Sequence, residues 1–295
     1  MSAAASDLVV EQAHERLQHP SGTETPRHQA PAGSAVDTLV SHIDISHGEP
    51  IIALDMDDVL SQTNEIVAKW HNEAYGTNMT VKDFLYYHYW KNPYWGTPDE
   101  TFQKVEDFWK TNYIEIVPPV EGAPEGVKKL RELGFRLVVV TARQEREMER
   151  GKKWLAQHFP GLIDGIVCTG QSQETLGDNE VLLTKLPKAE VCHKLGAKLL
   201  IDDSLENALK CVQANPPVPV ILFGDNEWNK RESTYKDISQ ELSFEQRLEK
   251  EGPGKEWWKE DEKKVQIPEG APLVRVKDWE EVVRWVEEAK KSGKL

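Results

Sequence analysis

The sequence predicts an α/β protein with a doubly wound parallel sheet and a small helical segment inserted after the first strand. Two observations predict this fold. Short apolar runs alternate with helical segments along most of the 295 residues, and several runs end directly on polar residues. The alternation is typical of parallel strands joined by crossover helices. Ligands of open α/β sheets bind beyond the carboxyl ends of the strands, so the polar residues there predict a functional site.

The first predicted strand is an apolar run, Ile51–Leu54, that ends on Asp55 and is followed by Asp57. A short apolar run that closes on a turn is typical of a buried parallel strand. Side chains two apart on an extended chain share a face, so both carboxylates can approach one reacting centre. Two such charges a few ångströms apart repel by a few kcal/mol at an effective dielectric constant of ~20. This repulsion favours a cation between them, and Mg²⁺ prefers oxygen ligands.

Further strands and helices are expected in alternation after this strand. Apolar runs bounded by turn residues indicate strands, and apolar residues three or four apart indicate helices. The expected strands are Arg136–Thr141, Gly165–Thr169, Val181–Thr184, Lys198–Asp203, Val218–Phe223 and Leu273–Val276. The expected helices between them are Pro124–Leu133, Glu145–His158, Lys188–Leu195 and a last one that Asp278 caps.

Residues 61–118 are rich in aromatic side chains and contain no convincing strand. Helices are expected at Asn64–Tyr75 and Thr80–Trp90. A third is expected after Thr97, because Thr-Pro-Asp-Glu combines a capping residue, a proline in the first turn and an acid three residues on. The segment is therefore predicted to be a helical insertion between two strands of the main sheet.

Two other segments are expected to lie outside the sheet. Residues 1–48 are rich in Ala, Ser, Pro, Gly and His, which predicts a flexible tail without chemistry. Residues 225–268 are highly charged and contain three tryptophans, which predicts a partly helical surface insertion. Residues 49–60 and 119–295 are then expected to form the core domain that carries this insertion.

Charge and composition restrict the partners. The net charge of −14 disfavours a nucleic-acid polymer, because binding one requires that Lys and Arg neutralise its phosphates. The three cysteines lack the spacing of a zinc site or disulfide framework, which suits a reducing compartment. No apolar run approaches the ~18 residues of a membrane helix, and the first residues lack the pattern of a targeting peptide. We therefore expect a cytoplasmic protein without a membrane partner, and the oligomeric state is left open.

Polar residues end three of the predicted strands, and a lysine precedes the third of these strands. The segments are Asp55-Met-Asp57-x-Val, Val-Val-Val-Thr141, the lysine, and Leu-Ile-Asp202-Asp203. In this order, over about residues 51–224, they resemble the four motifs of the haloacid dehalogenase-like (HAD) superfamily of phosphohydrolases. Within it the chain looks most like the 5′(3′)-deoxyribonucleotidase group, because of the Asp-Met-Asp start, Thr-Ala-Arg143, Leu-Ile-Asp-Asp and Asn-Lys-Arg231.

The resemblance implies a Mg²⁺-dependent phosphomonoester hydrolase with a Rossmann-like HAD core. Asp55 would be the nucleophile and Asp57 the general acid and base, while Asp202, the Asp55 carboxylate and the Asp57 carbonyl would bind Mg²⁺. The phosphoryl oxygens would be bound by Thr141, Ala142 and Lys188. These roles agree with the chemistry, because phosphoryl transfer depends mainly on positioning and charge neutralisation.

Four positions have more than one interpretation. Lys185 is the alternative to Lys188, since the length of this loop varies. Arg143 either clamps a phosphate bidentately or pairs with a local acid, and Asp203 is a further candidate at the acidic strand end. Asp58 stands where the nucleotidases usually have glycine. It can contact the metal's water shell or cap the next helix, and we favour capping.

The aromatic insertion occupies the place of the superfamily's cap, which closes over the site, excludes water and selects the substrate. Tyr87, Trp90 and Trp95 are candidates to stack on a base, although packing inside the helical segment explains each of them more simply. We expect a small phosphorylated metabolite as substrate, with (deoxy)nucleotides as the first candidates. The alternatives are another small phosphometabolite, or a non-catalytic binding protein with the same fold.

Overall fold

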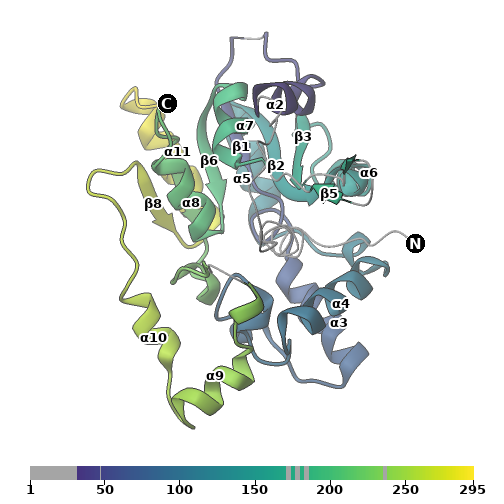
Figure 1. Ribbon diagram of the computed structural model, residues 1–295. Helices are drawn as coiled ribbons and strands as arrows, with labels where there is room; N and C mark the ends of the chain where they lie inside the picture. The colour runs from purple at the N-terminus through teal and green to yellow at the C-terminus, as the bar shows by residue number, and fades with distance from the viewer. Residues whose placement is uncertain (1–31, 47, 171–173, 177–179, 183–185, 235–237) are drawn as a thin grey trace.

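The computed structural model describes residues 32–46, 48–170, 174–176, 180–182, 186–234 and 238–295. Its centre is a six-stranded sheet, to which helices are joined on both faces (Figure 1). The strands of this sheet are β1 (Ile51–Leu54), β2 (Arg136–Gln144), β3 (Gly165–Gly170), β6 (Ala197–Asp202), β7 (Val220–Phe223) and β8 (Leu273–Val276). The short strands β4 (Glu174–Leu176) and β5 (Glu180–Leu182) form a separate antiparallel pair.

All neighbouring strands of the large sheet are parallel, in the order β3-β2-β1-β6-β7-β8. This confirms the doubly wound α/β fold. From β1 the chain adds β2 and β3 on one side, and later adds β6, β7 and β8 on the other side. The strand order therefore reverses direction beside β1. Open α/β sheets bind ligands at such a reversal, so the fold alone points to the carboxyl end of β1.

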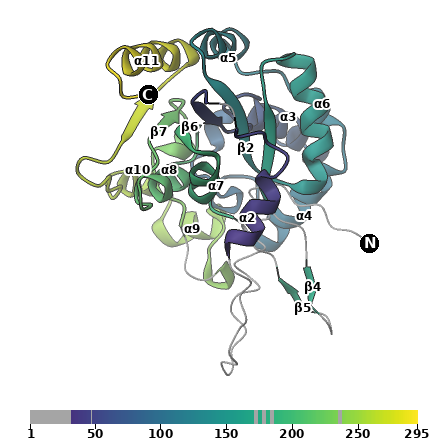
Figure 2. The same cartoon turned by 90° about the horizontal axis from the view of Figure 1, so that it is seen from above.

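The sheet lies between two layers of helices, which Figure 2 shows on opposite sides. Alternate residues of β1 enter separate hydrophobic clusters: Ile52 and Leu54 pack with α5, α6 and α11, while Ile51 and Ala53 pack with α2, α7 and α8. These helices are α2 (Ala32–Val40), α5 (Ala123–Glu132), α6 (Met148–His158), α7 (Lys188–Leu195), α8 (Leu205–Val212) and α11 (Trp279–Lys291). Because both faces are covered, the strands read as continuous apolar runs.

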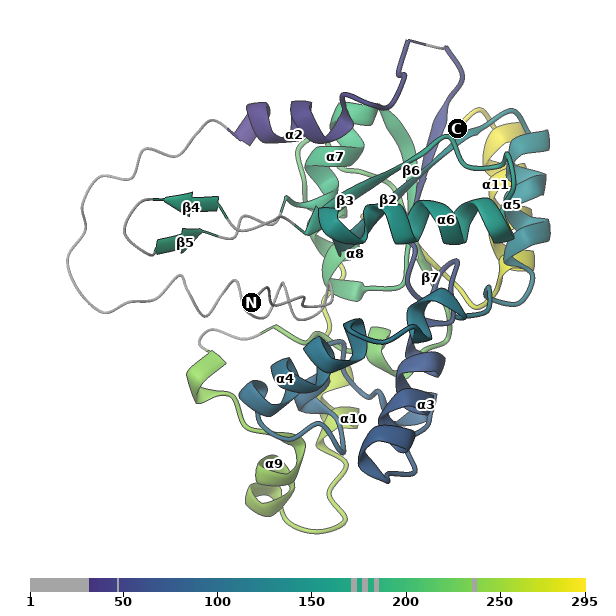
Figure 3. The ribbon, with the colours of Figure 1, turned by 90° about the vertical axis from the view of Figure 1, so that its right-hand side faces the viewer.

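A third group of helices lies beyond the carboxyl ends of the strands (Figures 1 and 3). We call residues 61–118 the cap segment; it contains α3 (Thr63–Tyr75), α4 (Pro98–Trp109) and the 3₁₀ turns η1 (Val81–Asp83), η2 (Tyr89–Lys91) and η3 (Tyr113–Glu115). We call residues 225–268 the C-terminal insertion; it contains η5 (Glu227–Asn229), η6 (Ile238–Gln240), α9 (Phe244–Glu251) and α10 (Trp257–Glu262). The remaining 3₁₀ turn, η4 (Glu145–Glu147), leads into α6.

The C-terminal insertion, predicted as a partly helical surface insertion, packs against the cap segment. The Tyr86 hydroxyl donates to Asp261 at 2.6 Å, and the Lys91 ammonium lies 2.9 Å from Glu241. Arg231 donates to the main-chain carbonyl of Leu85. Two segments distant in sequence thus form one layer above the sheet.

Two other expectations differ from the structure. The predicted tail extends too far, because Ala32–Val40 is helical and Val36, Val40 and Ile43 are buried against the sheet's α7 face; residues 1–31 lie outside the described residues. The expected helix Thr80–Trp90 is reduced to two 3₁₀ turns joined by a loop. Among the described helices, none combines the length and apolarity needed to cross a bilayer.

Candidate active site

Asp55 leaves the carboxyl end of β1 and is almost fully buried, with 6% of its surface exposed. Its main-chain N–H donates to Ile201 on β6 at 2.8 Å, so the backbone at this point is held by the sheet. One carboxylate oxygen, Oδ1, accepts from the Met56 N–H at 2.7 Å and lies 2.8 Å from the Lys188 ammonium. Oδ2 has no partner among the described residues, which leaves one oxygen free to react.

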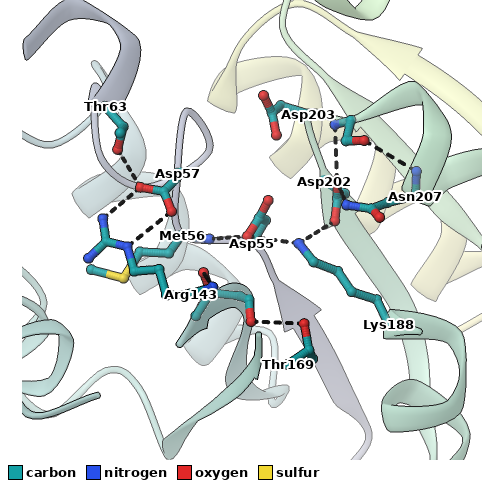
Figure 4. Close-up of polar contacts among 12 residues, drawn as sticks. Asp55, Met56, Asp57, Thr63, Arg143, Thr169, Lys188, Asp202, Asp203 and Asn207 are labelled. Carbon is teal, nitrogen blue, oxygen red and sulfur yellow. Dashed lines mark hydrogen bonds and ion pairs between the residues drawn. The ribbon is translucent and has the colours of Figure 1, made fainter. Parts of the chain in front are cut away.

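Lys188 begins α7 and reaches between the ends of β1 and β6 (Figure 4). Its ammonium lies 2.8 Å from Asp55 and 2.8 Å from Asp202, and the side chain is 1% exposed. Burial alone would lower the pKa of Lys188, but the two carboxylates raise it above its ordinary value. The lysine is therefore charged, and it neutralises part of the negative charge. The alternative, Lys185, lies outside the described residues.

The acids outnumber the buried cation at this point. Burial raises the pKa of Asp55 to about 7; Lys188 opposes the shift, while Asp202 and Asp57 add to it. Burial and then Asp55 also raise the pKa of Asp203 well above its ordinary range. Oxygens of Asp55, Asp202 and Asp203 all lie within 4.8 Å of one another. Such a buried, undercompensated set of carboxylates fits a hard divalent cation such as Mg²⁺.

Asp202 and Asp203 face different partners, although they are adjacent at the end of β6. Both carboxylate oxygens of Asp202 already accept hydrogen bonds. Oδ2 accepts from Lys188, while Oδ1 accepts from the Ser204 N–H at 2.9 Å and from Asn207 at 3.4 Å. Asp203 accepts the indole N–H of Trp228 at Oδ2, at 2.6 Å. Its Oδ1 has no partner within the described part of the chain. Asp203 is thus the better placed of the two to receive a metal.

Asp57 is held by a bidentate ion pair. Arg143 donates from Nη2 to Oδ1 at 2.6 Å and from Nε to Oδ2 at 3.0 Å, and the Thr63 hydroxyl donates to Oδ1 at 2.5 Å. The guanidinium is 2% exposed and lies 5.5 Å from the ring centroid of Trp109. Of the two interpretations of Arg143, the structure shows pairing with a local acid. The Asp57 side chain remains 23% exposed and lines the cavity described below.

Asp58 occupies the left-handed region, with φ = 55°. Asparagine and aspartate tolerate this conformation better than other residues with a side chain, which explains how Asp58 can stand at a position where glycine is usual. Its Oδ1 accepts from the Asn64 N–H in the first turn of α3, at 3.0 Å. This hydrogen bond confirms the capping interpretation.

Thr141 and Ala142 lie at the end of β2, beside Asp55. Thr141 is fully buried, and its hydroxyl accepts the Arg143 N–H at 3.2 Å, while its carbonyl accepts the Thr169 hydroxyl at 3.2 Å. β3 approaches closely here: a Cβ on Gly170 would lie 2.2 Å from the Ala142 carbonyl oxygen. Ala142 itself lines the cavity. The end of β2 is therefore fixed next to the acids.

A cavity of about 660 Å³, counting its open mouth, extends from the acids into the cap segment. Four of the acids line it: Asp55, Asp57, Asp58 and Asp203. The remaining walls are mostly aromatic and come from the cap segment and the C-terminal insertion; they include Tyr86, Tyr87, Tyr89, Trp95, Phe108, Trp109 and Trp228. The cavity thus combines a charged end with an apolar, aromatic body.

Only two of the three proposed cap aromatics line this cavity. Tyr87 and Trp95 do so, but Trp90 does not. The Trp90 ring is fully buried and stacks on His88, with centroids 4.7 Å apart and planes at 6°; Phe102 packs against its edge. Trp90 therefore belongs to the interior of the cap segment.

The sequence reasoning missed Trp228, Thr63 and Asn64. Thr63 and Asn64 follow the first motif closely, and their position before an apolar helical pattern is the one signal that could have found them. Asn64 accepts the Tyr89 hydroxyl at 2.7 Å, which ties α3 to the cap loop. Trp228 lies in a charged stretch, and nothing local in the sequence distinguishes it from the other tryptophans there.

Comparison with known proteins agrees with this geometry. Residues 49–190, about half of the chain, match the family described as "5′ nucleotidase, deoxy (Pyrimidine), cytosolic type C protein". No curated protein sequence matches the chain. The matched residues contain the first two polar strand ends and Lys188, but not Asp202, Asp203 or Trp228.

The chain is also similar to solved structures. One is a predicted phosphatase from Clostridium acetobutylicum, with 15% identity, 81% of this chain and 99% of that chain covered, and a TM-score of 0.45. Another is a HAD family hydrolase from Deinococcus radiodurans R1 with bound phosphate and sodium. The identity is 15%, the match covers 84% of this chain and 97% of that chain, and the TM-score is 0.46. A third is a D,D-heptose 1.7-bisphosphate phosphatase from B. bronchiseptica complexed with magnesium and phosphate. The identity is 14%, the match covers 81% of this chain and 98% of that chain, and the TM-score is 0.34.

Proposed function

We propose that the chain is a HAD-type phosphohydrolase, which its similarity to the deoxyribonucleotidase family over residues 49–190 supports, and that it hydrolyses small phosphomonoesters with Mg²⁺ through an aspartyl phosphate on Asp55. The observation that carries the proposal is the convergence of Asp55, Asp202 and Asp203 within 4.8 Å at the charged end of the cavity. A metal there supplies positive charge to the transferring phosphoryl group. Asp55, Asp203 and the Asp57 main-chain carbonyl would hold it, with Asp202 behind them.

The first half of the reaction uses the free oxygen of Asp55. Oδ2 attacks phosphorus while Oδ1 stays bonded to Lys188 and the Met56 N–H. The bond between phosphorus and the ester oxygen breaks, and the leaving alkoxide takes a proton from Asp57. Covalent catalysis by a carboxylate divides one difficult displacement into two easier ones.

The second half releases phosphate. Asp57 accepts a proton from water, whose oxygen attacks the phosphorus of the aspartyl phosphate, and the Asp55 carboxylate leaves. Lys188 helps to offset the charge on Asp55, and Thr141 and Ala142 fix the neighbouring strand end. These roles require positioning and charge neutralisation rather than large movements of the core.

A (deoxy)nucleotide is the substrate that the aromatic body of the cavity supports best. Tyr87 and Trp109 line the cavity together with the acids, and a base gains ~1–3 kcal/mol from stacking on such a ring. A screen of nucleoside monophosphates against sugar and carboxylic-acid phosphates tests this part. Preference for a compound without a base would contradict it and leave the phosphatase mechanism intact.

The mechanism itself is tested with Asp55→Asn. The amide cannot form the acyl phosphate, so we expect kcat on a generic aryl phosphate with Mg²⁺ to fall by at least about 10³-fold. The matched control is Asp225→Asn, because that side chain is 79% exposed and lies outside the cavity. It should retain wild-type activity. Hydrolysis by Asp55→Asn at a rate near wild type would refute the nucleophile.

A further inference from the structure

Asp203 has the geometry of a metal ligand held from one side. Its Oδ2 accepts a single hydrogen bond, from the Trp228 indole N–H at 2.6 Å, and its Oδ1 has no partner among the described residues. The carboxylate is 4% exposed and belongs to the 4.8 Å cluster with Asp55 and Asp202. Trp228 is therefore the one side chain that the described structure shows bonded to it.

Trp228 is held in place by contacts with both the sheet and the cap segment. Its 3₁₀ turn is tied to the sheet by Asn229, whose side-chain amide donates to the carbonyls of Phe223 at 2.9 Å and Gly224 at 3.0 Å. It is tied to the cap segment by Arg231, which donates to the carbonyl of Glu227 at 2.8 Å and to that of Leu85. The indole is 3% exposed. A ring held in this way gives its N–H a fixed direction.

The chemistry of the donor matters as much as its position. An indole N–H donates one hydrogen bond and carries no charge. It can therefore orient Asp203 while leaving the negative charge of this carboxylate for a cation, whereas Lys188 neutralises Asp55 and Asp202 directly. Partners that orient a metal ligand in this way commonly change metal affinity or activity by about 10–100-fold when removed.

We propose that Trp228 is the positioning residue that orients Asp203 toward the metal, so that the C-terminal insertion completes a site whose other members lie in the sheet. The inference rests on the proposed function, because it takes Asp203 as a metal ligand. It also assigns a role to a residue outside the matched range 49–190.

The test is Mg²⁺ binding to the full chain without substrate, measured by isothermal titration calorimetry. Trp228→Phe keeps an aromatic ring in the cavity and removes the N–H, and we expect the Kd for Mg²⁺ to rise about 10-fold. Circular dichroism checks that the variant is folded. Trp228→Leu, which also has no side-chain donor, is the second variant if the first does not fold.

Two matched Trp→Phe controls separate the hydrogen bond from the loss of ring size. Trp257 is buried in α10 away from the cavity, and Trp95 lines the cavity; neither indole N–H has an acceptor among the described residues. Both substitutions should leave the Kd for Mg²⁺ within about 2-fold of wild type. In an Asp203→Asn background, Trp228→Phe should raise the Kd for Mg²⁺ by less than about 2-fold more, because the carboxylate that Trp228 orients is gone.

The outcomes separate the two proposals. A wild-type Kd for Mg²⁺ in Trp228→Phe overturns the positioning role, even if the enzyme is an active phosphatase that needs Asp55. An equal rise in Kd in the Trp95→Phe control also overturns it, since the effect would then come from ring size. Undiminished hydrolysis by Asp55→Asn overturns the proposed mechanism without altering the binding measurement. Absence of Mg²⁺ binding to the wild type overturns both.

Discussion

Individual residues in this site divide the charge unequally. Lys188 offsets Asp55 and Asp202, Arg143 is paired with Asp57, and Asp203 has only an uncharged donor. Lys188 and Arg143 thus have carboxylate partners, and of the three clustered acids Asp55, Asp202 and Asp203, only Asp203 has no cation partner among the described residues. That distribution explains why a divalent cation fits beside Asp203.

Arg143 is expected to act on kcat rather than on substrate binding. Arg143→Lys replaces the bidentate fork with a single ammonium and loosens Asp57, so kcat should fall about 10-fold while KM changes less than about 3-fold. Steady-state kinetics with an aryl phosphate measure both constants. Arg146→Lys, on the neighbouring 3₁₀ turn and outside the cavity, is the matched control and should behave as wild type. A rise in KM at unchanged kcat would instead mean that Arg143 grips the substrate phosphate.

At the scale of elements, the sequence was informative where the signal is local. The apolar runs located all six sheet strands to within three residues at each end, and Ile51–Leu54 and Leu273–Val276 were predicted with the same bounds as β1 and β8. The helix start at Thr97 was predicted from its capping pattern, and the Thr97 side chain does accept the Glu100 N–H. These features depend on neighbours within a few residues, so the sequence contains their cause.

The segment Thr80–Trp90 was predicted to be helical, whereas most of it is a loop between two 3₁₀ turns. The sequence pattern does not show which groups pair with the main chain of this loop. Asn92 is fully buried, and its amide nitrogen donates to the carbonyls of Tyr86, His88 and Tyr89, while its oxygen accepts the Tyr86 N–H. One side chain thus bonds to four main-chain groups, and for the Tyr86 N–H and carbonyl it supplies the partner that a helix would otherwise provide. An apolar periodicity cannot distinguish this arrangement from a helical turn.

Asn92→Ala should therefore destabilise the protein strongly. It removes the partner of the Tyr86 N–H and of the Tyr86 carbonyl, and each such group costs ~1–3 kcal/mol when it is left unpaired, so we expect the free energy of unfolding to fall by at least about 2 kcal/mol. Urea denaturation measures this change. Asn78→Ala, at an exposed position of the same segment, should change it by less than about 0.5 kcal/mol. A loss below 1 kcal/mol for Asn92→Ala would mean that water replaces the amide.

At the scale of the whole molecule, the site is assembled from contacts that the sequence does not reveal. The strand ends could be predicted to converge, because carboxyl ends of parallel strands share one edge of the sheet. The partners of those ends could not: Trp228 reaches Asp203 from the C-terminal insertion, and Asp261 reaches Tyr86 across 175 residues. Such contacts depend on how whole segments pack, and the charged composition of residues 225–268 predicts a partly helical surface insertion without indicating what it packs against.

The contact between the cap segment and the C-terminal insertion is expected to stabilise α10. Tyr86→Phe removes the hydroxyl that donates to Asp261 while keeping the ring, and should cost about 1 kcal/mol. Hydrogen–deuterium exchange of the peptide covering α10 should become faster, while exchange of β1 and β6 stays at the wild-type rate. Tyr113→Phe, which removes an exposed contact with Glu73, is the matched control and should leave α10 unchanged. Equal acceleration across the sheet would show that the insertion is not a separate stabilising layer.

The central claim is that separate strand ends meet to hold a divalent cation beside a phosphoryl group on Asp55. It is tested most directly by a crystal structure with Mg²⁺ and beryllium fluoride, which mimics a phosphorylated aspartate. We expect beryllium bonded to Asp55 Oδ2 and Mg²⁺ in contact with Asp55 and Asp203. Beryllium fluoride bound elsewhere, or Mg²⁺ absent from these carboxylates at saturating concentration, would contradict it.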